Sequence, residues 1–159
     1  MNDSSEPRID TGHERRMDLQ EQLPDFYAAV LRMEKESRRH LDPVIAELVK
    51  VRISQINGCA FCLDMHTTDA RRAGEEEYRL HVLPAWREAP FFTARERAAL
   101  AVAERMARIS EGGVPDEEYE AAAKLFGEQE LAALLAVCVT INAWNRIAVS
   151  TRLAPPARD

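Results

Sequence analysis

Residues 43–74 read PVIAELVKVRISQINGCAFCLDMHTTDARRAG and contain two helix patterns separated by a turn. The dipeptide Asp42-Pro43 predicts a helix start, because Asp caps the first turn and Pro is tolerated at the first helical position. Apolar residues then recur three and four positions apart until Asn57-Gly58, which favours a turn. A second helix is predicted over about 59–73. We therefore expect two helices separated by a tight turn, which can fold back on each other as a hairpin.

The rest of the chain has the same helical spacing of apolar residues. Ala, Leu, Glu and Arg dominate it, which favours helices over strands. Thr93-Ala94-Arg95-Glu96 is a capping box that predicts a helix start. The expected helices cover about 25–39, 43–56, 59–73, 75–82, 94–109, 115–127 and 128–151. The predicted fold is all-α, a single-domain bundle of about six or seven helices over 21–152, with a flexible N-terminal tail or arm (1–20) and a C-terminal tail (153–159).

Size and charge exclude several classes of protein. A chain of 159 residues can bury one core without disulfides. It has 21 Lys and Arg against 27 Asp and Glu, a net charge of −6, so no nucleic-acid partner is expected. The longest apolar run, 131–139, is too short to span a membrane, and no apolar leader opens the chain. We therefore predict a cytoplasmic protein with no membrane partner.

The three cysteines include a close pair, Cys59 and Cys62. Structural disulfides are rare in the cytosol, so the pair indicates metal binding or redox chemistry, although an inert buried pair stays open. A structural zinc site usually needs four ligands, and no second close pair exists among His13, His40, His81 and Cys138. Covalent haem attachment needs His directly after the second Cys, where Leu63 stands. We expect neither a metal nor a cofactor.

A histidine and a glutamate accompany the pair. On a helix Cys62 lies about 60° around from Cys59, and His66 lies about 40° from Cys62 and about 6 Å along the axis. The first turn of a helix favours an anion such as a thiolate. If the two helices form a hairpin, Glu47 reaches the depth of His66 and can orient it or take a proton from Cys62 through it. The candidate catalytic residues are Cys62, Cys59, His66 and Glu47.

Other polar residues are expected to be structural. Cys138 lies in the apolar run and is predicted to be core. His40 and His81 have no evident partners and are predicted to be structural or exposed. The stretch Asn142-Ala143-Trp144-Asn145-Arg146 is predicted to form helix–helix hydrogen bonds at a subunit contact rather than to bind substrate.

The spacing Glu47, eleven residues, Cys59, two residues, Cys62, three residues, His66 resembles the core motif of the alkylhydroperoxidase AhpD-like proteins in the carboxymuconolactone decarboxylase family. The resemblance extends over most of the chain, through Glu47-Leu48-Val49-Lys50-Val51-Arg52, Ser54, Asn57-Gly58-Cys59, Met65-His66-Thr67, Ala85-Trp86-Arg87 and Ile141-Asn142-Ala143-Trp144-Asn145-Arg146. It implies an all-α fold and a homo-oligomer, commonly a trimer or hexamer.

The resemblance also implies residue roles. Cys62 would attack a hydroperoxide and become a sulfenic acid, and Cys59 would resolve it as a disulfide and meet the external reductant, a lipoyl-bearing or thioredoxin-like protein. Glu47 and His66 would form the proton relay. The decarboxylase branch lacks the cysteine pair, so lactone decarboxylation is not expected. The chain departs from the peroxidases at Phe61, where they have a second histidine.

The cysteine pair and the family resemblance leave three functions open. The first is a thiol-dependent peroxidase that reduces alkyl hydroperoxides in antioxidant defence. The second is a general dithiol–disulfide oxidoreductase or redox sensor that uses the same pair. The third is a non-catalytic oligomeric binding protein, in which neither cysteine matters for activity.

Overall fold

The computed structural model describes residues 12–157. These residues form eight α-helices and two 3₁₀ turns without a strand, so the predicted all-α fold is confirmed. The helices are α1 (Leu19–Gln22), α2 (Pro24–Ser37), α3 (Pro43–Asn57), α4 (Ala60–Arg72), α5 (Glu77–Val82), α6 (Ala94–Ala107), α7 (Asp116–Leu125) and α8 (Glu128–Thr151), with 3₁₀ turns at Leu83–Ala85 and Ile109–Glu111. Seven of the eight were predicted; the short α1 was not, because four residues are too few to show a helical period.

The predicted hairpin is formed by α3 and α4. Asp42 begins α3, since its side chain accepts hydrogen bonds from the N–H groups of Val44 and Ile45. Gly58 ends it in the left-handed conformation, with φ of 66°, which glycine adopts without steric cost. The chain therefore reverses directly after α3, and α4 packs back along it.

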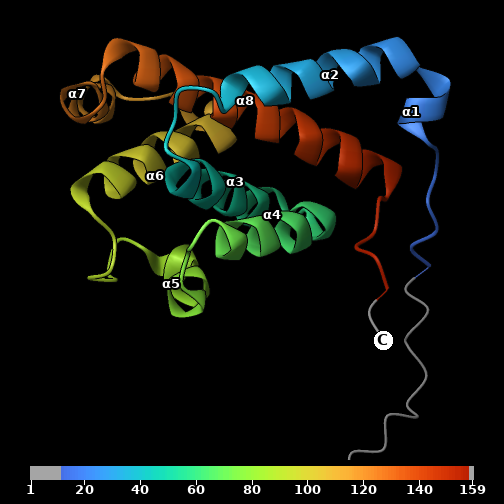
Figure 1. Ribbon diagram of the computed structural model, residues 1–159, viewed down its shortest axis with the longest axis horizontal. Coiled ribbons are helices and arrows are strands. Elements are labelled where there is room, and N and C mark those ends of the chain that lie inside the picture. Colours follow the sequence, from blue (N-terminus) through green and yellow to red (C-terminus); the bar gives the residue numbers. More distant parts are fainter. Residues whose placement is uncertain (1–11, 158–159) are drawn as a thin grey trace, which may run out of the picture.

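α3 is the central helix of the fold. It packs against α4, α6 and α8, while α2 lies along α8 (Figure 1). The main hydrophobic core lies between α3, α6 and α8 and includes Val49, Val102 and Leu134, each fully buried. A second core joins α3 to α5 and α6 around Leu83 and Trp86. Because α3 contacts three helices, several of its polar side chains are buried.

The long helix α8 runs across the bundle. It is long and apolar enough to cross a membrane by length and composition. That is weak evidence, because the core helix of a soluble protein passes the same test. Here α8 packs against α2, α3, α4, α6 and α7.

The segment before α1 lies against the end of α8. The backbone N–H of Arg16 donates to the carbonyl of Thr151 at 2.9 Å, and the Arg152 side chain donates to the carbonyl of Gly12 at 3.2 Å. Asp18 caps α1 through the N–H groups of two following residues. Part of the predicted tail is thus bonded to the helical domain. Residues 1–11 and 158–159 lie outside the described residues, and the domain boundaries stay predictions.

Candidate active site

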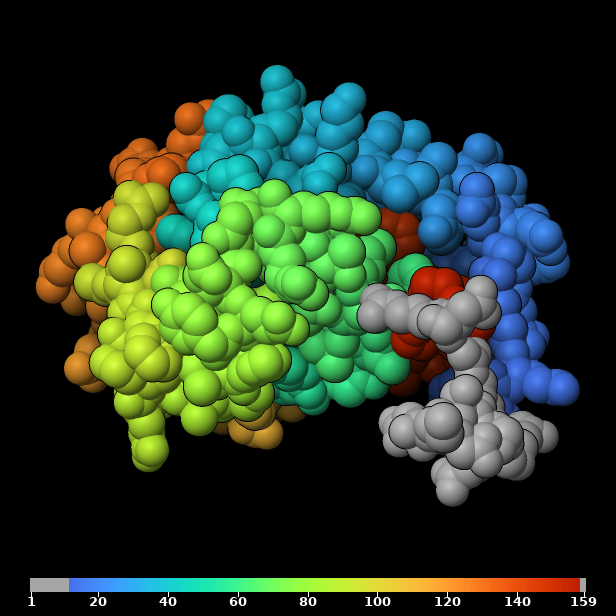
Figure 2. Space-filling model, turned by 60° about the horizontal axis from the view of Figure 1, so that its bottom comes forward, coloured from blue at the N-terminus to red at the C-terminus, as the bar shows by residue number. Residues whose placement is uncertain are grey.

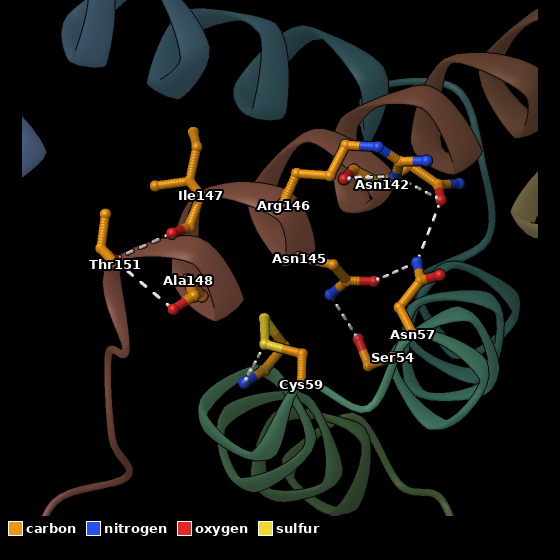
Figure 3. Close-up of a disulfide and its surroundings, with 10 residues drawn as sticks. Ser54, Asn57, Cys59, Asn142, Asn145, Arg146, Ile147, Ala148 and Thr151 are labelled. Atoms are coloured by element: carbon orange, nitrogen blue, oxygen red, sulfur yellow. Dashed lines mark hydrogen bonds between the residues drawn. A yellow bond between two sulfur atoms is a disulfide. The ribbon is translucent and has the colours of Figure 1, made fainter. Parts of the chain in front are cut away.

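The two cysteines meet at the start of α4. Cys59 is the extended residue that caps this helix, so the helix begins one residue later than predicted. Its Sγ accepts the backbone N–H of Cys62 at 3.3 Å, and the two cysteines form a disulfide with a Cα–Cα distance of 5.3 Å (Figure 3). Each is only 1% exposed. The short turn thus places both sulfurs together inside the protein.

Glu47 on α3 meets His66 on α4 across the hairpin. A Glu47 carboxylate oxygen lies 2.9 Å from His66 Nδ1, and both side chains are buried. Burial alone raises the pKa of Glu47. The hydrogen bond with His66 and the positive charge of Lys50 outweigh it, so the pKa lies below its ordinary value. Glu47 is therefore a carboxylate that fixes the orientation of the His66 ring.

Two further charged residues extend this pair and were missed from the sequence. Lys50 is fully buried, and its Nζ lies 3.1 Å from Glu47 Oε1 and 2.7 Å from Glu34 Oε1. A continuous series of polar groups thus runs from Glu34 on α2 through Lys50 and Glu47 to His66. A lysine between two buried valines on α3 was an available signal for a buried cation. No such signal pointed to Glu34, because its partner Lys50 is 16 residues away on another helix.

A cavity of about 270 Å³ opens beside these groups. Cys62, His66, Glu47 and Lys50 all line it, whereas Cys59 does not. Its apolar lining comes from α1, α2, α4, α8 and the segment after α8: Leu19, Tyr27, Leu31, Phe61, Met65, Trp144, Ile147, Ala148 and Leu153. In the space-filling view the N-terminal segment (blue), α4 (green) and the end of α8 (red) meet on one side of the molecule (Figure 2). The nucleophile candidate therefore faces a mainly apolar binding space.

In the polar stretch 142–146 of α8, Asn145 bonds to α3 and Trp144 lines the cavity. Asn145 accepts from Asn57 at 2.9 Å and donates to Ser54 at 3.0 Å, so the expected helix–helix hydrogen bonds exist (Figure 3). They join α8 to α3 within one chain, and the predicted subunit contact of this stretch stays a prediction. Trp144 packs edge-to-face on Tyr27 at a centroid distance of 5.2 Å and lines the cavity. Trp144 thus lies at the cavity wall, while the expectation that this stretch does not bind substrate stays a prediction.

The remaining sequence candidates lie outside the site. Cys138 is a fully buried free thiol on α8, and burial raises its pKa to about 12, so it is inert core as predicted. His81 is largely exposed, 3.9 Å from Glu77, and His40 is exposed beside Gln129. Neither histidine lines the cavity.

One group of residues has the composition of a partial metal site. Ligand atoms of Glu47, His66 and Asp69 lie within 4.8 Å of one another. The ammonium group of Lys50 already lies against Glu47, and a divalent cation would have to displace or face it. This charge arrangement suits a proton relay better than a resident metal.

Residues 24–105 match the family model described as the carboxymuconolactone decarboxylase family. The chain belongs to this family. Among curated relatives, the uncharacterised protein YdfG of Bacillus subtilis is 39% identical over 137 residues, which cover 86% of this chain and 93% of YdfG. The uncharacterised protein YnjA of Escherichia coli is 36% identical over 104 residues, 65% of this chain and 56% of YnjA.

Two solved structures share the fold. A protein of unknown function from Agrobacterium tumefaciens, provisionally assigned as the antioxidant defence protein AhpD, superimposes with a TM-score of 0.87 at 34% identity, over 91% of this chain and 100% of that one. A peroxidase-related protein with an alkylhydroperoxidase AhpD core from Ralstonia eutropha has a TM-score of 0.75 at 20% identity, over 86% and 74% of the two chains, and shows the fold alone. The chain is an AhpD-like member of the carboxymuconolactone decarboxylase family.

Proposed function

We propose that this protein is a thiol-dependent peroxidase that reduces alkyl hydroperoxides, with Cys62 as the nucleophile. One observation carries the proposal: Cys62 lines the same cavity as the buried Glu47–His66 pair, and a second cysteine lies within disulfide distance. A nucleophile, a base and a group that orients the base are the elements of nucleophilic catalysis by a thiol. The names of the AhpD-like relatives point to the same chemistry.

The proposed reaction balances within these residues. The Cys62 thiolate attacks the terminal oxygen of the hydroperoxide, the O–O bond breaks, and Cys62 becomes a sulfenic acid. The departing alkoxide takes a proton from the Glu47–His66 pair and leaves as the alcohol. The Cys59 sulfur then attacks the Cys62 sulfur, and the proton of the Cys59 thiol joins the departing hydroxide to give water. The disulfide so formed protects Cys62 from further oxidation.

The cavity lining supports an organic substrate. Its walls carry aliphatic and aromatic side chains from α2, α4 and α8, and burial of an alkyl group there contributes roughly 25 cal/mol per Å². Phe61, at the position of the second family histidine, is one of these walls. In place of that histidine, the relay has the buried extension through Lys50 to Glu34.

We place this enzyme in the cytoplasm as a homo-trimer or homo-hexamer, with a lipoyl-bearing or thioredoxin-like protein as its reductant. A decarboxylase role fits less well, because lactone decarboxylation has no use for a redox cysteine pair. The second candidate is a dithiol–disulfide oxidoreductase or redox sensor. The apolar Phe61 favours it, because this side chain can neither donate nor accept a proton beside Cys62.

The test separates the two candidates. The reduced protein, freed of excess reductant, receives one equivalent of cumene hydroperoxide while free thiols and peroxide are followed together. A peroxidase loses two thiols per peroxide consumed, and Cys62→Ser leaves the peroxide intact. Cys59→Ser consumes one equivalent and then stops. Persistent peroxide, together with rapid oxidation of the pair by a disulfide reagent, would identify the dithiol exchanger instead.

A further inference from the structure

The two sulfurs of the disulfide differ in what they face. Both cysteines belong to the main core, but Cys62 also lines the cavity and Cys59 does not. The backbone N–H of Cys59 donates to the carbonyl of Ser54 at 3.1 Å. Both cysteines are 1% exposed, so the cavity is the route by which a molecule reaches the pair in this structure. A sulfur nucleophile that enters there meets Cys62 first.

The two sulfurs also differ as leaving groups. The Sγ of Cys59 accepts the backbone N–H of Cys62 at 3.3 Å, at the N-terminal end of the 13-residue helix α4. A hydrogen bond to sulfur and the positive end of a helix both stabilise a thiolate. In thiol–disulfide exchange the more stable thiolate leaves faster. Burial disfavours a thiolate on both sulfurs equally, since each cysteine is 1% exposed, so the hydrogen bond makes Cys59 the better leaving group. Cys59 needs no access to solvent to leave.

We propose that the reductant of this protein attacks Cys62 through the cavity and that Cys59 is the thiolate released. The reductant is a dithiol, one thiol of which reaches Cys62 Sγ through the mainly apolar cavity. Its thiolate bonds to Cys62 Sγ, and the Cys59–Cys62 bond breaks with its electron pair on Cys59. A second thiol of the reductant then attacks the mixed disulfide and releases the Cys62 thiolate, so the reductant loses two electrons and the protein gains them.

The inference rests on the redox cycle proposed above. The family resemblance implies that Cys59 meets the reductant, whereas here Cys62 does. Cys62 then meets both the oxidant and the reductant, one after the other, in the same cavity. Cys59, which does not line the cavity, acts as the resolving thiol during oxidation and as the leaving group during reduction. A thiol fixed on the surface of a folded protein reaches Cys62 only if it projects into the cavity.

The direct test maps the mixed disulfide. The oxidised full-length protein is mixed with 2-mercaptoethanol, quenched with acid at early times, and digested with trypsin to the peptide 53–71, which contains both cysteines. Fragment spectra are expected to place the adduct on Cys62. An adduct on Cys59 at the earliest times would overturn the proposal.

Single-cysteine variants exclude migration of the adduct. Cys59→Ser and Cys62→Ser are each converted to the S-methyl mixed disulfide and then reduced by 2-mercaptoethanol. The Cys62 disulfide of the first variant is expected to be reduced about tenfold faster or more, because exchange requires access to the sulfur. Equal rates, or faster reduction at Cys59, would contradict entry through the cavity.

A matched pair of variants on α2 tests the route itself. Leu31 lines the cavity, and Arg32 is an exposed neighbour that does not. Leu31→Trp is expected to slow reduction of the wild-type disulfide severalfold, and Arg32→Trp to leave its rate unchanged. Equal rates in the two variants would overturn the route. None of these tests uses a peroxide, so their outcome is independent of whether the protein proves to be a peroxidase.

Discussion

Two buried carboxylates, Glu104 and Glu47, line different cavities and have different partners. Glu104 on α6 accepts from Arg52 at 2.8 Å and from the Trp86 indole at 3.0 Å, and it also pairs with Arg87. Glu47 is held by Lys50 and His66 beside a cysteine. Burial raises the pKa of both carboxyls, and in both the hydrogen-bond partners lower it more.

The difference lies in what the partners can do with a proton. Arginine keeps its proton at any physiological pH, so the Glu104 cluster can hold charge but cannot transfer it. An imidazole nitrogen can donate or accept a proton during a reaction, so the Glu47–His66 pair can transfer one. A buried carboxylate with a lowered pKa is therefore insufficient to mark an active site. The identity of its partners and a nucleophile in the same cavity decide it.

The largest expected effect is that of Glu47→Gln. The amide keeps the shape but loses the charge that orients His66 and stabilises its protonated form. Loss of a positioned proton relay lowers the rate by about 100-fold or more. Steady-state peroxide consumption measures it, with thermal unfolding as the check that the variant is folded. A Glu47→Gln enzyme within a few-fold of wild type would show that the pair is only structural.

Lys50→Met should have the next largest effect. Without the cation, the described residues offer Glu47 only His66 and Glu34 only Arg38, 3.7 Å away. The loss costs about 3 kcal/mol of stability. The pKa of Glu47, now held down by Lys50, rises, so the carboxylate is lost at a higher pH and the acid limb of the activity profile moves upward.

Lys50→Arg retains the charge and serves as the control for this shift. Its pH profile should lie closer to wild type than that of Lys50→Met, even if the larger guanidinium lowers stability. Coincident profiles of wild type and Lys50→Met would show that Lys50 has no part in the relay.

Phe61→His adds a proton-exchanging group to the site, whereas Glu47→Gln and Lys50→Met remove charged groups from it. The new side chain lies at the cavity wall next to Cys62. The expected change is a rise of only a few-fold in the peroxide reaction, since Glu47 and His66 already supply the proton. Phe61→Leu controls for loss of the aromatic ring. A fall in rate with histidine, matched by leucine, would indicate that the ring binds substrate.

Glu104→Gln should have the smallest effect on activity and a clear effect on stability. In the wild type the lowered pKa of Glu104 contributes stability. This contribution is fully present at a pH above the ordinary carboxyl pKa of about 4.5, and it is lost as the pH falls through the pKa of Glu104 in the folded protein. The variant should therefore be less stable than wild type at pH 7, with a smaller difference in acid. Chemical unfolding at several pH values measures this, and turnover per folded molecule should stay unchanged.

Local patterns in the sequence predicted much of the fold and the centre of the site. The Asp42-Pro43 start, the Asn57-Gly58 turn and the spacing of Cys59, Cys62 and His66 are consequences of helix geometry, which acts over a few residues. They placed Glu47 opposite His66 correctly. The assignment of catalytic roles to these four residues stays a prediction until the chemistry is measured.

The rest of the site depends on packing between distant segments. Nothing local distinguishes Lys50, fully buried, from an ordinary solvated lysine except its apolar neighbours on α3. Glu34 and Trp144 reach the cavity because α2 lies along α8. The attachment of Arg16 to the end of α8 likewise joins residues more than a hundred positions apart. Such contacts follow from tertiary structure and have no period in the sequence.

The most direct measurement is to trap the first oxidation product. Reduced Cys59→Ser is treated with one equivalent of cumene hydroperoxide in the presence of dimedone, and the peptide 53–71 is analysed by mass spectrometry. If Cys62 is the nucleophile of a peroxidase, a dimedone adduct forms there in proportion to the peroxide consumed, and Cys138 stays unmodified. Unchanged peroxide with no adduct on Cys62 would contradict the proposed function.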